Sequence, residues 1–352
     1  MARSARKTTI ATVARSAGRS ISTVSAALNN APGVAPATRE EIVRIAAELG
    51  YEADPRARLL RAARTGVIGV SYYLGQAFQA ELIDALYRAA ELHGLGLALA
   101  ASTPRHGEVE GLRALVRDRC EAIIVVDSLI PYGELRAVVG GLPLLYLCRE
   151  SPSPEVRAVR STDEAAMHDL VDHLVSTGRR HIVHVDGGES PSRDLRAHAY
   201  VEAMARHGLR ARILPGGSGE EAGIAAIEQL AGEGEFPEGI LFFNDHAAIG
   251  ALLELRRRAI RVPEDVAIAG FDGIAITGLS AVDLTTVRQD VDRIAETAIR
   301  HLAGVLSDAS ESRKGADLGG ARGSAEEAGS LLVSSLEAVP TRLVVRGSTA
   351  IE

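Results

Sequence analysis

The chain has 352 residues, of which 46% are hydrophobic and 24% charged, and its net charge is −7. These are ordinary values for a globular protein, and the length predicts two or three domains. Aromatic residues make up 3% and Trp is absent, so aromatic stacking on sugars or bases is not expected to dominate recognition. No apolar stretch follows the basic N-terminus and no window reaches about 18 apolar residues, so we expect a cytoplasmic protein without export or membrane insertion.

The charge is distributed unevenly along the chain. Residues 1–64 contain eleven Lys and Arg against five Asp and Glu, a net of +6. The other 288 residues contain 28 basic and 41 acidic residues, a net of −13. This pattern favours nucleic-acid binding by the N-terminal part. An anionic membrane is the competing target, but this part lacks a helix face with bulky apolar residues.

Residues 1–52 are predicted to form a small helical domain. A first helix over 9–17 is followed by Gly18, which supplies a turn, and by Ser20, whose hydroxyl caps a second helix. Pro36 fits the first turn of a third helix over 36–49. The residues expected to form the core are Ile10, Val13, Ala14, Val24, Ala27, Leu28, Ile42, Ile45, Ala46 and Leu49. This is helix-turn-helix spacing.

After residue 66 short apolar runs alternate with amphipathic segments. We predict strands at 67–72, 95–101, 122–126, 142–148, 181–185, 211–214, 239–243, 266–271 and 341–348, and helices at about 79–93, 107–118, 133–139, 163–176, 192–207, 219–231 and 246–258. Two runs of βα units predict two doubly wound α/β subdomains with a cleft between them, where ligands bind at the strand ends. The polar, Gly- and Ser-rich segment 307–330 is predicted to be a disordered insertion.

Read as a whole, the chain resembles the lactose-repressor (LacI/GalR) family of bacterial transcription regulators. The resemblance rests on "TIATVARSAGRSISTVSAALNN", "VAPATREEIVRIAAELGY", "DPRARLLRAARTGVIGV", "FNDHAAIGALLELR", "RVPEDVAIAGFD", "DLTTVRQD" and "RLVVRGST", in the family's order and spacing. It implies a helix-turn-helix domain over 1–52, a hinge helix within 53–65 and an effector-binding and dimerisation domain over 66–352. It also implies a homodimer on a near-palindromic DNA operator, no cofactor and no enzymatic activity.

The resemblance also assigns the residues that read DNA. They are Thr9, Ser20, Ile21, Ser22, Thr23, Ser25, Ala26 and Asn29 in the helix-turn-helix, and Arg56, Ala57 and Leu60 in the hinge. Arg19, where the family prefers Val, could contact a phosphate or a base, and the alternative is a solvated turn residue. Leu60 would wedge into the minor groove, Ala57 would pack beside it and Arg56 would hold a phosphate. The alternative for Leu60 is packing between linker and body. Family members often carry Arg where this chain has Ala26, so part of the direct base contact is missing or moved.

For the effector, the resemblance assigns Arg196, Asn244, Asp245 and Asp272, with Arg149, Gln76 and Phe78 as looser candidates. All of them follow predicted strands, where a doubly wound fold binds ligands. Asp245 could instead cap the next helix, and Arg196 could form a surface ion pair. A carboxylate and a guanidinium in one cleft suit sugar hydroxyls, and would equally suit a nucleobase or a sugar phosphate.

Other motifs are weaker. "GGSGEEA" (216–222) has the spacing of a dinucleotide-binding turn, but a plain glycine-rich turn is the better interpretation. The histidine pairs His168/His173 and His181/His184 do not share a face, so no metal site is expected. Cys120 and Cys148 are expected to be reduced core thiols. The sequence therefore predicts a metabolite-responsive regulator, most often a repressor in this family. The rival is a periplasmic-type sugar-binding protein.

Overall fold

The computed structural model describes residues 8–28, 32–51, 64–318 and 336–350. It divides into two compact units, residues 1–65 and 66–352, here called the head and the body. Each unit has a hydrophobic core of its own and is described by itself.

The head is the three-helix unit that the sequence predicts. Helices α1 (Ile10–Ser16), α2 (Ile21–Leu28) and α3 (Pro36–Glu48) surround a small core. The fully buried members of that core are Val13, Ala14, Val24, Ala27, Ile42 and Ala46, all of them expected from the spacing. Gly18 has φ +58°, a left-handed conformation that costs glycine little, and this turn separates α1 from α2.

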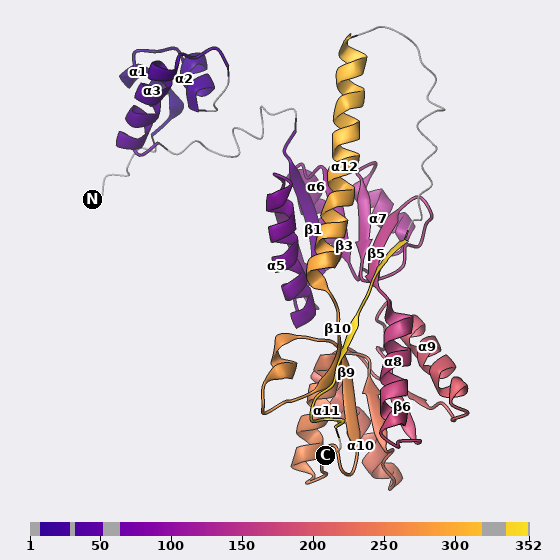
Figure 1. The fold of residues 1–352 in the computed structure, drawn as a ribbon. Helices are drawn as coiled ribbons and strands as arrows, with labels where there is room; N and C mark the ends of the chain where they lie inside the picture. The colour runs from indigo at the N-terminus through magenta and orange to yellow at the C-terminus, as the bar shows by residue number, and fades with distance from the viewer. Residues whose placement is uncertain (1–7, 29–31, 52–63, 319–335, 351–352) are drawn as a thin grey trace. The chain divides into compact units, whose positions relative to one another are not determined.

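The first lobe of the body is a six-stranded parallel sheet in the order β11-β5-β4-β3-β1-β2. Its strands are β1 (Val67–Tyr73), β2 (Gly96–Ser102), β3 (Ala122–Val126), β4 (Leu144–Leu147), β5 (Arg157–Ser161) and β11 (Leu336–Val339). Helices α5 (Ala77–Leu92) and α12 (Val291–Leu318) cover one face, and α6 (Glu108–Arg117) and α7 (Tyr132–Val139) cover the other (Figure 1). All five residues of β3 are buried, as expected for a central strand covered on both sides.

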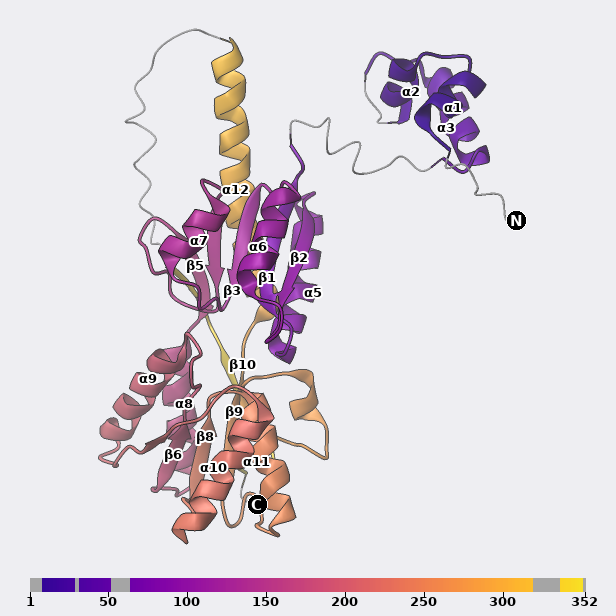
Figure 2. The ribbon, with the colours of Figure 1, turned by 180° about the vertical axis from the view of Figure 1, so that it is seen from behind.

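The second lobe repeats the architecture with the order β12-β10-β9-β8-β6-β7. Its strands are β6 (Ile182–Val185), β7 (Ile213–Leu214), β8 (Gly239–Phe242), β9 (Ala267–Asp272), β10 (Thr285–Arg288) and β12 (Arg342–Val344), the last pairing antiparallel to β10. Helices α8 (Asp163–Ser176) and α9 (Arg193–Arg206) cover one face, and α10 (Glu220–Glu233) and α11 (Asp245–Arg257) the other (Figure 2). The predicted doubly wound fold is confirmed.

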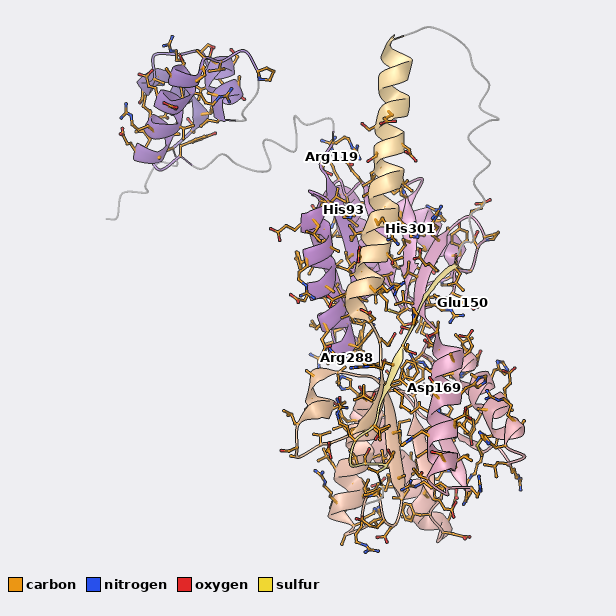
Figure 3. The ribbon with its side chains drawn as sticks, in the orientation of Figure 1. His93, Arg119, Glu150, Asp169, Arg288 and His301 are labelled. Atoms are coloured by element: carbon orange, nitrogen blue, oxygen red, sulfur yellow. The ribbon has the colours of Figure 1, made fainter. Side chains whose placement is uncertain are left out.

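The chain passes between the lobes three times. The first crossing leads from β5 of the first lobe to α8 of the second lobe. The second crossing leads back from β10 to α12, and the third leads from β11 to β12. The crossing segments therefore lie near Thr162, Gln289 and Pro340, and they run side by side between the lobes (Figure 1). Charged side chains such as Glu150 and Asp169 lie on the outside of the body (Figure 3).

The structure corrects the prediction in several elements. β5, β10, β11, α12 and the 3-10 helix at Ala275–Gly278 were not predicted, and the last strand is shorter than 341–348. The first part of the predicted disordered insertion, 307–318, is instead helical and continues α12. Ala, Glu, Arg and Lys are good helix formers, so a missing apolar period in this stretch does not exclude a helix. Residues 319–330 lie outside the described residues.

Every helix among the described residues is too short or too polar to span a bilayer.

Candidate functional site

In the head, α2 presents the surface predicted to read DNA. The Ser20 hydroxyl accepts a hydrogen bond from the Thr23 backbone N–H at 3.0 Å and so caps the helix, as predicted. Ile21 is 47% exposed and Ser22 is also exposed, whereas Ser25 and Ala26 are half-buried. Small side chains on this face allow the backbone of α2 to approach a partner closely.

The flanking residues of the predicted DNA surface are also placed. Thr9 precedes α1 and pairs its hydroxyl with that of Thr12 at 3.2 Å, and Arg19 is exposed in the turn. Arg39 of α3 donates to the carbonyl oxygen of Ala27 at 2.9 Å, which satisfies a free carbonyl at the end of α2. The remaining predicted residues, Asn29, Arg56, Ala57 and Leu60, lie outside the described residues.

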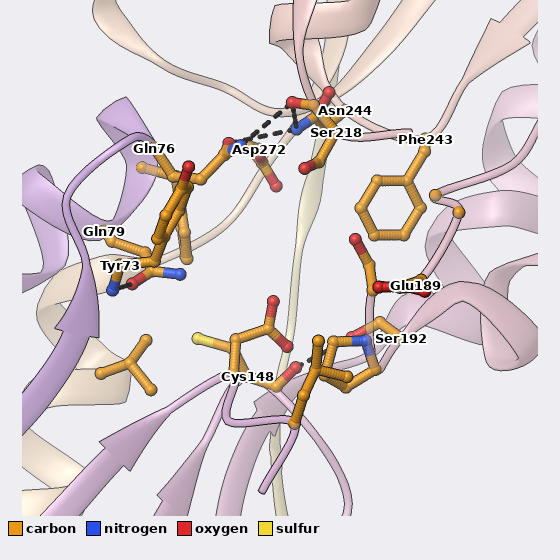
Figure 4. Close-up of a pocket in the computed structure, with 18 of the residues that line it drawn as sticks. Tyr73, Gln76, Gln79, Cys148, Glu189, Ser192, Ser218, Phe243, Asn244 and Asp272 are labelled. Atoms are coloured by element: carbon orange, nitrogen blue, oxygen red, sulfur yellow. Dashed lines mark hydrogen bonds between the residues drawn. The ribbon is translucent and has the colours of Figure 1, made fainter. Parts of the chain in front are cut away.

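The body contains a cavity of about 540 Å³ between the ends of the two sheets, within the range of small-molecule sites. It is lined by loops that follow strands of both lobes, as the doubly wound fold predicts (Figure 4). Five of the seven predicted effector residues line it, namely Gln76, Phe78, Arg196, Asn244 and Asp272.

Gln76 and Asn244 hydrogen-bond across the cavity from opposite lobes. The Asn244 Nδ2 donates to Gln76 Oε1 at 3.2 Å, and both side chains donate to the carbonyl oxygen of Ser218, at 2.9 and 3.0 Å (Figure 4). Asn244 also caps α11, because its Oδ1 accepts the Ala247 N–H at 3.0 Å. Asn244 therefore both caps α11 and hydrogen-bonds across the two lobes.

Arg196 lies on α9 and is 5% exposed, so the surface ion pair considered for it is wrong. Its guanidinium donates to Asp163 at 2.8 Å and to the carbonyl oxygen of Phe243 at 2.6 Å, and it lies 4.0 Å from Asp272. The rings of Phe243 and Phe271 lie 4.5 and 3.6 Å from the guanidinium carbon. A buried arginine needs such partners, because an isolated buried charge is strongly unfavourable.

Asp245 does not line the cavity, so its predicted effector contact is not supported by the geometry. It is fully buried and accepts hydrogen bonds from the backbone N–H of Gly273 and Ile274, at 2.7 and 2.9 Å, and from the Thr286 hydroxyl at 2.6 Å. It joins the loop after β9 to β10 and has a structural role. Burial raises its pKa to about 7, although its three donors oppose that shift. Asn244, and not Asp245, is the helix cap.

Arg149 also lies outside the cavity lining. Its guanidinium donates to the carbonyl oxygen of Ser128 and stacks 5.3 Å from the ring of Tyr146. It lines a smaller neighbouring depression with Glu150 and Asp194. The rule that ligands bind at the carboxyl ends of parallel strands (the strand-end rule) placed Arg149 near the cavity, but it could not show which way the side chain points.

The chain was compared with known proteins. Residues 9–54 match the model of bacterial regulatory proteins of the lacI family, and residues 171–318 match a periplasmic binding protein-like domain. A LacI transcriptional regulator from a Rhodococcus species is 31% identical, with a TM-score of 0.70 over 80% of this chain and 98% of that one. The chain belongs to the LacI family. It is a DNA-binding transcription regulator, and regulators of this family are not enzymes.

Two further relatives extend over most of the chain. The transcriptional regulator GalR of Escherichia coli K12 is 29% identical over 85% of this chain and 89% of its own length. The lac repressor dimer bound to operator and the anti-inducer ONPF superposes with a TM-score of 0.81 over 98% of this chain and all of that one. At 23% identity this second likeness shows the fold, which includes both the head and the two-lobed body.

Several cavity residues of this LacI-family chain were missed. Asp127 follows β3, Cys148 follows β4, and Glu108 begins α6, while Gln289 lies in a crossing segment. Cys148, which we expected in the core, is only half-buried and lines the cavity. A stricter use of the strand-end rule would have found Asp127 and Cys148, because both come directly after runs of buried apolar residues.

The glycine-rich stretch 216–222 also lies at the cavity. The N–H groups of Gly216 and Gly188 donate to the carboxylate of Asp186, at 2.9 and 3.0 Å. These donors are therefore occupied within the protein, as expected for a glycine-rich turn and not for a phosphate cradle. No group of three or more His, Cys, Asp or Glu side chains among the described residues is arranged to hold a metal ion.

Proposed function

We propose that the protein is a repressor whose binding to DNA is controlled by a small molecule in the body cavity. The observation that carries the proposal is the hydrogen-bonding of Gln76 to Asn244 and Ser218, which joins the two lobes inside the cavity. A ligand that enters must contact or replace these bonds. Because it binds both lobes, it favours one relative position of the lobes over another, and that difference can alter DNA affinity.

We further propose that two copies act as a homodimer on a near-palindromic operator, in the cytoplasm where the DNA is. The relatives support this, since the lac repressor is described as a dimer bound to operator. Residues 1–52 would read the major groove and residues 53–65 would form the hinge, with Leu60 entering the minor groove. The body 66–352 would bind a sugar or related metabolite and form the dimer contact.

The experiment is a selection of operator sequences by the full chain, followed by anisotropy titrations on the selected and on scrambled DNA. Affinity should fall steeply with salt on both. Leu60→Ala should weaken operator binding far more than scrambled binding, because a wedge acts only at a kinkable step. Arg56→Ala is the matched control: it should weaken binding on both DNAs about equally, since phosphates carry no base identity.

Two results would contradict the proposal. If both variants lose DNA affinity by the same factor on the operator and on scrambled DNA, the proposed role of Leu60 in the hinge is wrong. A chain that selects no sequence, but binds sugars, would support the rival class of a sugar-binding protein.

A further inference from the structure

The ionisable residues that line the cavity are mostly acidic. Glu108, Asp127, Glu189 and Asp272 face it, against one basic residue, Arg196. The Arg196 charge is already matched, because Asp163 is paired with it at 2.8 Å and Asp272 lies 4.0 Å away. Acidic groups therefore outnumber basic groups in the cavity lining, and a positively charged ligand group would favour the ionised form of these carboxyls.

The backbone donors at the cavity rim do not reverse this polarity. A phosphate or carboxylate ligand would need free N–H groups or an unpaired cation. The Gly188 and Gly216 N–H groups are taken by Asp186, and the start of α11 is capped by Asn244. The start of α6 carries Glu108, a negative charge of its own. An anionic ligand thus meets carboxylates where it would need donors.

Asp127 is the least satisfied of the four carboxyl groups. Its Oδ1 is buried and has no hydrogen-bond partner among the described residues. Burial raises the pKa of Asp127 to about 7, and burial also raises that of Glu108, which is held only by the hydroxyls of Ser71 and Ser128. Arg196 and Arg149 lower the pKa of Asp127, and Arg149 lowers that of Glu108, but burial outweighs them at both carboxyl groups.

The backbone holds Asp127 in a conformation that few residues adopt. Its φ of +53° is in the left-handed region, which Asp and Asn tolerate better than most other residues. A strained residue that lines the cavity and has one buried oxygen without a partner is poorly explained as a structural element. Such a group is well explained as one that binds a ligand atom.

We propose that the effector is a polyhydroxylated small molecule that carries a protonated amine, and that its ammonium group donates to the carboxylate of Asp127. The proposal rests on the proposed function and narrows its ligand class. The hydroxyls of such a ligand fit the uncharged polar groups of the opposite lobe, including Asn244 and the Ser218 carbonyl. A neutral sugar would supply the hydroxyls but no positive charge to pair with the carboxylate.

The test uses matched probes on the full chain. Isothermal titration calorimetry at pH 7.5 compares the amine D-glucosamine with its neutral counterparts D-glucose and N-acetyl-D-glucosamine. The same comparison is made in the galactose and mannose series. D-Glucose 6-phosphate serves as the anionic probe. At least one amine should bind about 10- to 100-fold more tightly than its neutral parent, because hydrogen bonds between charged partners are the strong ones. The phosphate should bind most weakly.

Asp127→Asn should abolish the preference for the amine, so that the affinities for the amine and for its neutral parent differ by less than about twofold. Asn tolerates the same backbone conformation, so the variant should fold. Asp118→Asn, an exposed carboxylate at the end of α6, is the matched control and should keep the preference.

The proposal is overturned if no amine binds more tightly than its neutral parent, if the phosphate binds most tightly, or if Asp127→Asn keeps the preference. These results leave the proposed function intact, because the selection of operator DNA is measured separately. If the chain selects no operator but still prefers the amine, the proposed repressor function is refuted and the proposed ligand class is kept.

Discussion

Replacing Asp127 by Asn should stabilise the protein at alkaline pH and not at acid pH. Burial raises the pKa of Asp127 from 3.8 to about 7. The folded state therefore holds this proton more tightly than the unfolded chain, and stability falls as pH rises between about 4 and 7. At 1.36 kcal/mol per pKa unit, the loss between pH 5 and pH 8 is about 3 kcal/mol. Asn does not titrate, so the variant does not lose this stability as pH rises.

The measurement is thermal unfolding of the full chain and of the Asn variant at pH 5 and pH 8. For a body of this size about 3 kcal/mol corresponds to roughly 6 °C in the melting temperature. The variant should gain that much over the parent on going from pH 5 to pH 8. Asp245 and Asp272, whose pKa values burial also raises, cancel in this comparison because both proteins contain them. A variant-to-parent difference that is the same at both pH values would refute the reasoning.

Three other predictions concern separate parts of the chain. Arg196→Ala should lower the free energy of unfolding by about 3–5 kcal/mol in denaturant titrations, because it leaves the buried Asp163 unpaired, and a loss below 1 kcal/mol would contradict the buried pair. Ser20→Ala should destabilise the head by about 1 kcal/mol, measured by hydrogen exchange of its helices, whereas the exposed Ser22→Ala should not. Deleting 307–330 should shift the melting temperature by less than about 2 °C, since its described side chains are mostly exposed; a larger loss would show that the segment is packed.

The sequence predicted the elements whose pattern is strong. β3 matches its predicted bounds because five consecutive apolar, mostly β-branched residues fit only a strand covered on both sides. α2 begins at Ile21 because Ser20 supplies the cap. α12 was not predicted, because its second half, from residue 307, is polar and carries no apolar period.

The site was predicted less completely than the fold. The strand-end rule and the family resemblance placed Arg196, Asn244 and Asp272 at the cavity. Neither could separate Asn244 from its neighbour Asp245, because each side chain is held by partners distant in sequence. Asn244 bonds to Gln76 and Ser218, whereas Asp245 bonds to Gly273, Ile274 and Thr286. Helices α10 and α11 also pack closely. A Cβ at Gly223 would overlap the carbonyl oxygen of Ala247, and one at Gly250 would overlap that of Glu220. These long-range contacts are not visible in local sequence.

The cavity is connected to the segments that join the lobes by hydrogen bonds between buried side chains. The Ser161 hydroxyl donates to Gln289 Oε1 at 2.6 Å, and Gln289 Nε2 donates to Asp272 at 2.8 Å. Ser161 and Gln289 lie in two different crossing segments, whereas Asp272 lines the cavity next to Arg196. A ligand that bonds to Oδ1 of Asp272 must share that oxygen with Gln289 or displace Gln289 from it. Because the buried amide would then lose a partner, at a cost of about 1–3 kcal/mol, ligand binding and the geometry of the crossing segments cannot be independent.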